Sequence, residues 1–487
     1  MEKKKKKYLQ TLLPILLLVV FSIAIRIPYT RDIEGVVGGD AFNYLAKSQA
    51  LVQGDDPFAA DPRKGPIFSL LLTPGLFTSD PLLWSRWVGV LAAAATVAML
   101  PFLARRLGIS WPLAVGSGLL LAVNPEFIWE SPNALANTLF TAGIVASVLA
   151  YLKSLSSPRW LMVLSVIVAL TTLTRYEGIL VAAVLLPVAW WQYRRQPKRI
   201  IASALIAVAI VALPLVSFFW SGVSGIRTPA DIAGDEGLAL ALSKDTLRLN
   251  LARAIRFMND AWTMRANTTI SLILLGAGIV WWIRVQKWQA LPVLLVPLLQ
   301  AILITLVLPK SRYFLPLLPF MSLALVFILQ AVQGKKYAIY RSSAAVLVVV
   351  GASALFLIEG HTNLALRVEK YNADAHESAV LIDAARYLRN DHGRVGLRDS
   401  QLSSPVSIYI PADRLFVLSI NPDDDIVRQE LSWMRKEKIK YLLSDSDPAP
   451  WDSMDIYPDA FERVHVFESI YGEKRVFIYK IWQEKLP

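Results

Sequence analysis

Long apolar runs separated by short charged segments dominate the hydrophobic pattern of this chain. Several of these runs approach the roughly 20 apolar residues that an α-helix needs to cross a bilayer. Eleven runs predict transmembrane helices, and they cover residues 8–28, 84–104, 111–124, 133–152, 160–173, 178–193, 200–220, 268–283, 289–308, 313–332 and 342–358. The pattern therefore predicts a polytopic α-helical membrane protein.

The short connections between the spans predict their orientation. If the N-terminus is cytoplasmic, every connection on the inner side is basic, and Glu2 is the only acid among them. These connections are Lys3–Lys7, Arg105–Arg106, Lys153–Arg159, Arg194–Arg199, Arg284–Lys287 and Lys335–Arg341. Because cytoplasmic loops carry an excess of Lys and Arg, we expect a multi-pass protein of the cell (plasma) membrane with a cytoplasmic N-terminus.

Three larger segments, 29–83, 221–267 and 360–487, then fall on the outer side. The second of them predicts an amphipathic helix that either rests on the lipid surface or guides a lipid substrate. In the third the apolar runs shorten, which predicts helices at 373–390 and 423–438 and strands at 394–398, 415–420, 440–444, 461–469 and 475–481. We therefore expect a transmembrane core over residues 1–359 and an extracytoplasmic α/β domain over residues 360–487.

Composition supports this class and narrows the chemistry. Of the 487 residues, 55% are hydrophobic and 18% are charged, and the mean hydropathy is +0.46, whereas soluble proteins carry about 25% charged residues. The absence of cysteine excludes disulfides, zinc thiolate sites, iron–sulfur clusters and cysteine nucleophiles. The net charge of +12 would suggest nucleic-acid binding in a soluble protein. In a membrane protein the Lys and Arg residues first have to be assigned to the two sides of the membrane, and we expect no nucleic-acid partner.

The first outer segment contains two candidate residues, an acid and a base. Asp40 begins a predicted short helix that lies along the membrane, and Lys64 precedes a Gly65-Pro66 turn. Aspartate is common at helix N-caps. Asp40 is therefore either a structural cap or an acid that is available as a general base at the outer membrane surface.

A second candidate lies at the outer end of a short span, where Arg175 and Glu177 occur in the run Thr174–Gly178. Charged groups at this depth cost about 2.5–3.5 kcal/mol each on insertion scales. Residues two apart on a helix do not face each other, so we expect each of them to pair with another group. They are either snorkelling interfacial groups or a site in which Arg175 binds an anion and Glu177 orients it.

More charged residues fall on the same predicted side. Glu126 and Glu130 lie four residues apart in one short loop, where like charges require a cation partner or a wet cleft. Lys310 and Arg312 lie just before a span. This gathering of acids and bases at one depth predicts a site at the outer membrane boundary, with a scattered interfacial belt as the alternative.

Together these features resemble the GT-C superfamily of membrane glycosyltransferases, in particular the protein O-mannosyltransferase and lipid A aminoarabinose transferase group (dolichyl-phosphate-mannose–protein mannosyltransferase-like). The matching elements are Gly39-Asp40 with Tyr44, Lys64-Gly65-Pro66, the run Thr174–Gly178, and Ser311-Arg312-Tyr313 with Leu315-Pro316. The chain departs from the family at Ala41, where many relatives carry a second acid, and at Gly65, where they carry proline.

The resemblance implies a cell-envelope enzyme that transfers a sugar from a polyisoprenyl phosphate to an acceptor hydroxyl on a glycolipid, glycan or protein. It implies Asp40 as the catalytic base and Lys64, Arg175 and Arg312 as ligands of the donor phosphate. The further candidates for donor or acceptor contacts are Tyr44, Glu126, Glu130, Glu177 and Lys310. Because phosphate is a stable leaving group, one base suffices, and direct displacement would invert the anomeric carbon.

Several alternatives stay open at this stage. No cofactor is predicted, although a divalent cation on the carboxylates of Asp40, Glu126 or Glu130 is compatible with the sequence. The main rivals are an oligosaccharyltransferase- or O-antigen-ligase-like enzyme with a pyrophosphate-linked donor, a secondary transporter, and an assembly scaffold without catalysis. The transporter is disfavoured because the chain shows no internal repeat and its charges lie at the predicted outer boundary rather than at mid-membrane.

Overall fold

The computed structural model describes residues 2–33, 40–54, 64–220, 248–252, 276, 280, 291–307, 311–332, 338–389, 391, 393–397, 406, 409–410, 414–417, 433–444, 461–468 and 475–482. The chain forms two compact units. The first comprises Met1–Thr30, Asp56–Leu71 and Ser85–Ala365, and the second comprises Arg31–Asp55, Leu72–Trp84 and Leu366–Pro487. The expected boundary at residues 359/360 stays a prediction.

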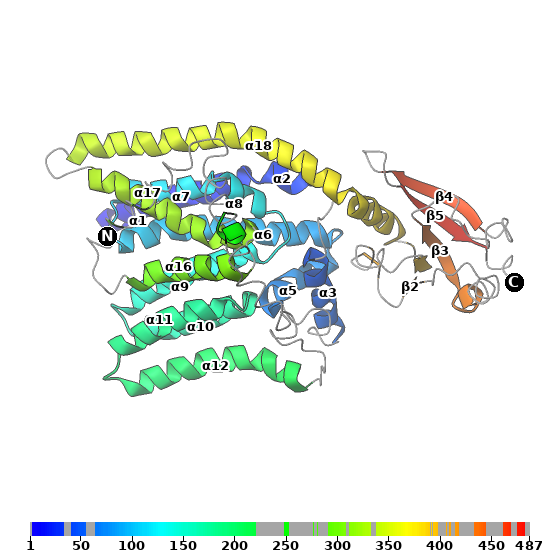
Figure 1. The fold of residues 1–487 in the computed structure, drawn as a ribbon, viewed down its shortest axis with the longest axis horizontal. Helices are drawn as coiled ribbons and strands as arrows, with labels where there is room; N and C mark the ends of the chain where they lie inside the picture. The colour runs from blue at the N-terminus through cyan, green and yellow to red at the C-terminus, as the bar shows by residue number, and fades with distance from the viewer. Residues whose placement is uncertain are drawn as a thin grey trace. The chain divides into compact units, whose positions relative to one another are not determined.

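The described part of the first unit is built from helices, some of which continue into the second unit (Figure 1). Its helices are α1 (Glu2–Ala24), α2 (Ile27–Asp32), α5 (Pro66–Leu72), α6 (Pro81–Arg106), α7 (Trp111–Ala122), α8 (Pro125–Glu130), α9 (Asn137–Ser154), α10 (Arg159–Thr174), α11 (Gly178–Gln192), α12 (Pro197–Trp220), α16 (Leu291–Val307), the 3₁₀ helix η3 (Ser311–Leu317), α17 (Leu318–Val332) and α18 (Ala338–Arg389).

Among the described residues, three helical stretches are long and apolar enough to cross a membrane, namely Thr11–Arg31, Pro81–Arg106 and Arg312–Ala331. Shorter apolar helices such as Trp111–Ala122 and Leu291–Thr305 also coincide with predicted spans. Every predicted span except 268–283 overlaps a described helix, and 268–283 lies outside the described residues apart from residues 276 and 280. The expected number of eleven spans stays a prediction.

The helices of the first unit pack around an apolar core. Helix α10 packs against α9, α11 and α12, while α17 packs against α7. The short helix η3 contacts α8, α9 and α16. This arrangement brings the beginning of α9, the α10–α11 turn, α16 and η3 together, and these elements form the candidate site.

A buried arginine fixes the position of α8. Arg26 is fully buried and donates to Ser22 O at 2.7 Å, Ala122 O at 3.2 Å and Ser131 Oγ at 3.0 Å, and its guanidinium lies 5.3 Å from the centre of the Phe127 ring. Burying a cation is costly unless it is hydrogen-bonded, and these bonds engage Nε and Nη1, while Nη2 is buried without a partner among the described residues. Arg26 therefore ties the α1–α2 junction to the end of α7 and to the C-cap of α8.

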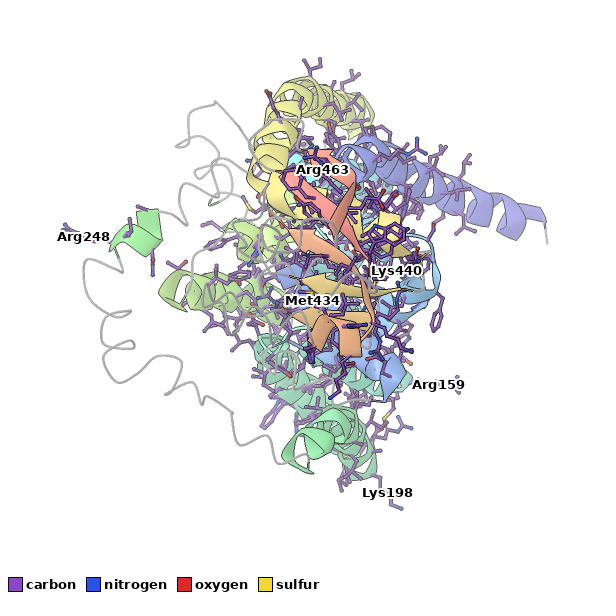
Figure 2. All side chains as sticks on the ribbon, turned by 90° about the vertical axis from the view of Figure 1, so that its right-hand side faces the viewer. Arg159, Lys198, Arg248, Met434, Lys440 and Arg463 are labelled. Atoms are coloured by element: carbon purple, nitrogen blue, oxygen red, sulfur yellow. The ribbon has the colours of Figure 1, made fainter. Side chains whose placement is uncertain are left out.

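The second unit contains a five-stranded mixed sheet in the order β2-β1-β3-β5-β4. Its strands are β1 (Arg394–Leu397), β2 (Leu415–Val417), β3 (Ile439–Ser444), β4 (Phe461–Glu468) and β5 (Arg475–Ile481). Strands β1, β2 and β3 are parallel, and β4 and β5 form an antiparallel pair. Figure 2 labels Lys440 on β3 and Arg463 on β4. All five predicted strands are present, and the connection between β4 and β5 lies outside the described residues.

Helix α18 differs from the expectation because it runs without interruption from the last predicted span into the predicted helix at 373–390. Of the other predicted helix, 423–438, the described residues 433–436 are helical. The predicted amphipathic helix in 221–267 lies outside the described residues except for 248–252, which are helical.

Two short helices also belong to the described part of the second unit. Helix α3 (Asp40–Gln53) begins at Asp40, as the sequence predicts, and buries Phe42, Tyr44 and Leu45. It packs against the 3₁₀ helix η1 (Thr73–Phe77).

Candidate functional site

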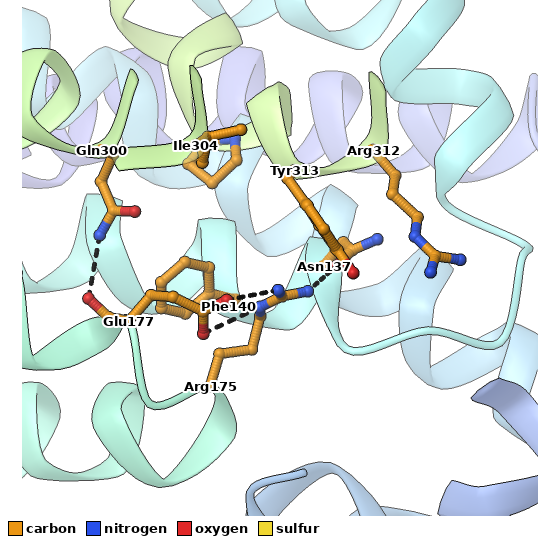
Figure 3. A pocket seen from close by; sticks show the side chains of 9 residues that line it. Asn137, Phe140, Arg175, Glu177, Gln300, Ile304, Arg312 and Tyr313 are labelled. Atoms are coloured by element: carbon orange, nitrogen blue, oxygen red, sulfur yellow. Dashed lines mark hydrogen bonds and ion pairs between the residues drawn. The ribbon is translucent and has the colours of Figure 1, made fainter. Parts of the chain in front are cut away.

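A small pocket in the first unit collects two of the predicted arginines (Figure 3). It has an empty volume of about 250 Å³. Its lining residues are Asn137, Phe140, Arg175, Glu177, Gln300, Ile304, Arg312, Tyr313 and Pro316. We call it the arginine pocket. It joins α9, the α10–α11 turn, α16 and η3, which are far apart in the sequence.

The geometry of Arg175 corrects one expectation from the sequence. Arg175 is not helical: α10 ends at Thr174, and Arg175 has extended backbone angles of φ −148° and ψ 132°. Its Nη2 therefore reaches Glu177 Oε1 at 2.6 Å and its Nε reaches Glu177 Oε2 at 3.4 Å. The expectation that these two residues would pair only with other groups was wrong, because the helical spacing rule does not apply across a turn.

Two further contacts orient the Arg175 guanidinium. Its Nη1 donates to Asn137 Oδ1 at 2.5 Å, and its centre lies 4.5 Å from the ring centre of Tyr313 and 5.8 Å from that of Phe140. Burial raises the pKa of the Glu177 carboxyl, but the charge and hydrogen bonds of Arg175 outweigh this effect and hold the pKa below its ordinary value. Glu177 is therefore an anion that holds Arg175 in place.

Arg312 brings a second cation to the pocket. Its guanidinium lies 5.4 Å from the ring centre of Tyr313, which also contacts Arg175. Arginine is suited to phosphate because its planar donors match the oxygens of a phosphoryl group. The charged residues that line the pocket are Arg175, Arg312 and Glu177, so the lining holds two cationic side chains and one anionic side chain.

Two amides in the pocket carry polar atoms for which no described residue supplies a hydrogen bond. Asn137 Oδ1 accepts from Arg175 and Gln300 Nε2 donates to Glu177 O at 3.1 Å, so the orientation of both amides is defined. The remaining atoms, Asn137 Nδ2 and Gln300 Oε1, are buried without a partner among the described residues. Such groups are costly, at about 1–3 kcal/mol each, and a donor and an acceptor at one pocket fit a ligand hydroxyl.

Lys64 lies next to the α10–α11 turn because Gly65 packs against the end of α10. A Cβ atom at position 65 would fall 2.0 Å from the carbonyl oxygen of Leu173 and 2.9 Å from the carbonyl carbon of Thr174. Only glycine permits this approach. The absence of a side chain at position 65 therefore lets the segment that contains Lys64 approach the backbone before Arg175. Lys64 itself is not one of the pocket-lining residues.

The two glutamates of the predicted loop lie on α8 rather than at the pocket wall. Asn124 caps this helix by accepting from Phe127 N at 3.0 Å, and both Glu126 and Glu130 are buried. Helix α8 contacts η3, the element that carries Arg312. Glu126 and Glu130 thus belong to the packing behind η3, and neither lines the pocket.

The remaining predicted residues lie elsewhere. Asp40 and Tyr44 belong to α3 in the second unit, where Asp40 is partly exposed and Tyr44 is buried. Lys310 lies outside the described residues. Asn137 and Gln300 were not predicted, and the available signal was a polar side chain in or beside an otherwise apolar span.

A metal site finds no support among the described residues, since these contain no group of three or more His, Asp or Glu side chains that could hold an ion. Asp40, Glu126 and Glu130, the carboxylates considered for a cation, do not form such a group.

Comparison with protein families gives one match. Residues 72–223 match the model of the dolichyl-phosphate-mannose-protein mannosyltransferase family. This range includes Arg175 and Glu177. Among curated proteins, no sequence reaches a significant match.

Comparison with solved structures shows the fold. ArnT from Cupriavidus metallidurans in its apo state is 13% identical, with a TM-score of 0.58 over 98% of this chain and 99% of that chain. The same protein bound to undecaprenyl phosphate is 12% identical, with a TM-score of 0.56 over 96% and 98%. The Archaeoglobus fulgidus oligosaccharyltransferase is 13% identical, with a TM-score of 0.52 over 98% of this chain and 75% of that chain, and it has also been solved with zinc and sulfate.

These findings confirm the predicted resemblance to GT-C membrane glycosyltransferases, and they support the assignment of the chain to the glycosyltransferase class of enzymes. The fold is that of an integral membrane protein with this architecture.

Proposed function

We propose that this protein is a glycosyltransferase that moves a sugar from a polyisoprenyl-phosphate donor to an acceptor hydroxyl on the outer face of the membrane. The observation that carries the proposal is the arginine pocket, in which Arg175 and Arg312 flank the ring of Tyr313. A cation-rich pocket with an aromatic wall suits a phosphate that is bonded to a sugar.

In the proposed reaction the acceptor hydroxyl attacks the anomeric carbon of the donor sugar. The bond from this carbon to the phosphate oxygen breaks, and the phosphate leaves with the electron pair. Arg175, Arg312 and Lys64 stabilise the departing anion. The Asp40 carboxylate accepts the hydroxyl proton. Attack opposite to the leaving group inverts the anomeric carbon.

The polar contacts of the pocket support a donor that carries a sugar. A phosphodiester offers acceptors but no donor, whereas Gln300 Oε1 needs a donor and Asn137 Nδ2 needs an acceptor. A sugar hydroxyl supplies both. We assign Tyr44, Glu126, Glu130, Glu177 and Lys310 to donor or acceptor contacts, with Glu177 acting through Arg175.

A second candidate function is transfer from a pyrophosphate-linked oligosaccharide, because the fold is shared with the archaeal oligosaccharyltransferase. The family match favours the first proposal, because the model that matches residues 72–223 is described by a dolichyl-phosphate-mannose donor, a sugar linked through a single phosphate. One of the similar solved structures, ArnT, is likewise bound to undecaprenyl phosphate.

The test is sugar transfer from radiolabelled polyprenyl-phosphate hexoses and pentoses in membranes that contain matched amounts of each variant. We expect Asp40→Asn to lose about 10²–10⁴-fold in rate, the range for a general base. Arg175→Lys keeps the charge but loses the fork that binds Glu177 and Asn137, and we expect a loss of about 10²–10³-fold.

The matched controls are Glu462→Gln, which removes an exposed carboxylate from β4, and Arg105→Lys at the end of α6. Both should transfer at the wild-type rate. Equal transfer by Asp40→Asn and the wild type would remove Asp40 from the mechanism. Transfer only from a pyrophosphate-linked oligosaccharide would replace the first proposal by the second.

A further inference from the structure

Asp80 in the second unit is the centre of a polar cluster. Its Oδ1 accepts from Leu83 N at 3.0 Å, which caps α6, and from the Tyr409 hydroxyl at 2.9 Å. Its Oδ2 forms an ion pair with Arg386 Nη2 at 2.6 Å. The Arg386 guanidinium also lies 5.4 Å from the ring centre of Tyr409. The C-terminal part of α18 is thereby bound to the start of α6.

Arg389, one turn further along α18, binds the neighbouring backbone. It donates to Ser79 O at 2.5 Å and to Thr78 O at 2.7 Å. Thr78 in turn closes η1, since both its backbone N–H and its hydroxyl donate to Gly75 O. Arg389 therefore holds the residues that terminate η1.

The short helix η1 is tightly confined. A Cβ atom at Gly75 would fall 2.5 Å from the Trp84 ring, so there is no room for η1 to shift toward α6. Its other neighbour is α3, which begins at Asp40. A continuous chain of contacts thus runs from α18 through η1 to α3, entirely inside the second unit.

We propose that Arg386, Arg389 and Tyr409, the α18 clamp, set the position of α3 and through it the position of Asp40. The clamp residues are positioning residues, because they would act on the reaction only through η1 and α3. This inference rests on the proposed role of Asp40 as the base. It gives the C-terminal part of the chain a role in the reaction, which is to hold the helix that carries this base.

The clamp is suited to positioning rather than to overall stability. The Arg386 and Asp80 side chains are 39% and 23% exposed, and ion pairs of this exposure contribute little to stability. Asp80 also caps α6, so replacing it would remove both the cap and the ion pair with Arg386, and the two effects could not be separated. The arginines are therefore the better sites for a test.

The experiment compares the full-length wild type with the double variant Arg386→Leu, Arg389→Leu. The matched control is Arg394→Leu, which removes a similarly exposed ion pair with Glu437 in the same unit. The described contacts of Arg394 involve Glu437 and Phe416, and none involves the segment 72–84. A third variant, Arg386→Lys, Arg389→Lys, restores the charge.

Two readouts are taken on the same preparations. In hydrogen exchange, the amides of residues 40–53 should exchange faster in the leucine variant and at the wild-type rate in the control. In transfer assays, kcat should fall about 10–100-fold with KM for the donor within about twofold, because a misplaced base affects the chemical step. The lysine variant should recover most of kcat.

The exchange readout does not depend on the proposed function. If exchange in 40–53 is unchanged in the leucine variant, the clamp does not hold α3 and the inference is wrong. If exchange rises but kcat stays at the wild-type value, the clamp has no role in positioning Asp40. If the wild type transfers no sugar from any polyprenyl-phosphate donor, the proposed function fails, while the exchange result still decides whether the clamp exists.

Discussion

The missing side chain at position 65 determines how closely the segment with Lys64 approaches the end of α10. We expect Gly65→Ala to destabilise the protein by about 1–3 kcal/mol, the usual cost of overpacking. The reason is that the new Cβ would lie 2.0 Å from Leu173 O, and a backbone atom cannot move aside as a side-chain tip can. The free energy of unfolding in detergent and the transfer rate should both fall.

The matched control at this scale is Gly351→Ala in α18, where a Cβ meets nothing within 4 Å. Alanine is favoured over glycine in a helix by about 0.5–1 kcal/mol, so this variant should be as stable as the wild type or slightly more stable. A Gly65→Ala protein with wild-type stability and activity would show that the Lys64 segment does not need this close approach.

Single residues are also where prediction from the sequence was least complete. Arg175 and Arg312 were predicted as ligands of one anion, and the pocket contains both. The ion pair of Arg175 with Glu177 was missed because the pairing rules assume a helix, whereas α10 ends at Thr174. Gln300 and Asn137 were missed because a lone amide in an apolar span has no distinctive spacing.

At the scale of elements, hydrogen bonds from charged side chains hold the residues that follow α18 against β3. Arg414 donates to the carbonyl oxygens of Gly393 and Asp391, and Asp391 accepts from Lys440 Nζ at 2.9 Å and from the Tyr441 hydroxyl at 2.7 Å. Burial raises the pKa of Asp391, but its hydrogen bonds from Lys440, Tyr441 and Gly393 outweigh this and lower the pKa to about 2. The last turn of α18 is thereby joined to β3.

The lowered pKa of Asp391 predicts the direction in which stability changes with pH. The contribution of Asp391 is fully present above its ordinary pKa of 3.8 and is lost as the pH falls toward 2. We expect Asp391→Asn to lower the free energy of local opening of β1 and β3 by at most about 1 kcal/mol near pH 6. The effect is small because the ion pair of Asp391 with Lys440 is partly exposed. Hydrogen exchange at several pH values measures this difference, which should vanish near pH 2. A difference that does not change with pH would contradict the assignment.

Elements were predicted better than residues. Apolar runs located the long described helices but not the short helices α5 and α8, the second of which was predicted as a loop. Alternation located the strands β1 to β5, because both patterns are set by burial on one face. The continuity of α18 was missed for a physical reason. The boundary near residue 360 was placed where composition changes, but residues 361–389 contain no proline or glycine that would end a helix.

At the scale of the whole molecule, each of the two units is built from three separate stretches of the sequence, which composition did not predict. The second unit contains Arg31–Asp55 and Leu72–Trp84 as well as Leu366–Pro487, so two segments of the first predicted outer loop fold with the C-terminal region. A domain boundary deduced from composition alone cannot reveal this, because the contacts join segments about 300 residues apart, such as Asp80 and Arg386. If these segments share a unit, they must lie on the same side of the membrane.

The orientation of the chain can be measured directly because the protein has no cysteine, so any introduced cysteine is unique. The positive-inside pattern predicts that Ser156, in the basic turn between α9 and α10, faces the cytoplasm and that Glu462 on β4 faces the exterior. Both side chains are exposed. In intact cells a membrane-impermeant maleimide should label Glu462→Cys but not Ser156→Cys, and permeabilisation should make Ser156→Cys reactive.

Labelling of Ser156→Cys alone would invert the topology and place the C-terminal sheet in the cytoplasm. Because the proposed reaction needs Asp40 and the α18 clamp on one side, that result would require Asp40 to act on the cytoplasmic face.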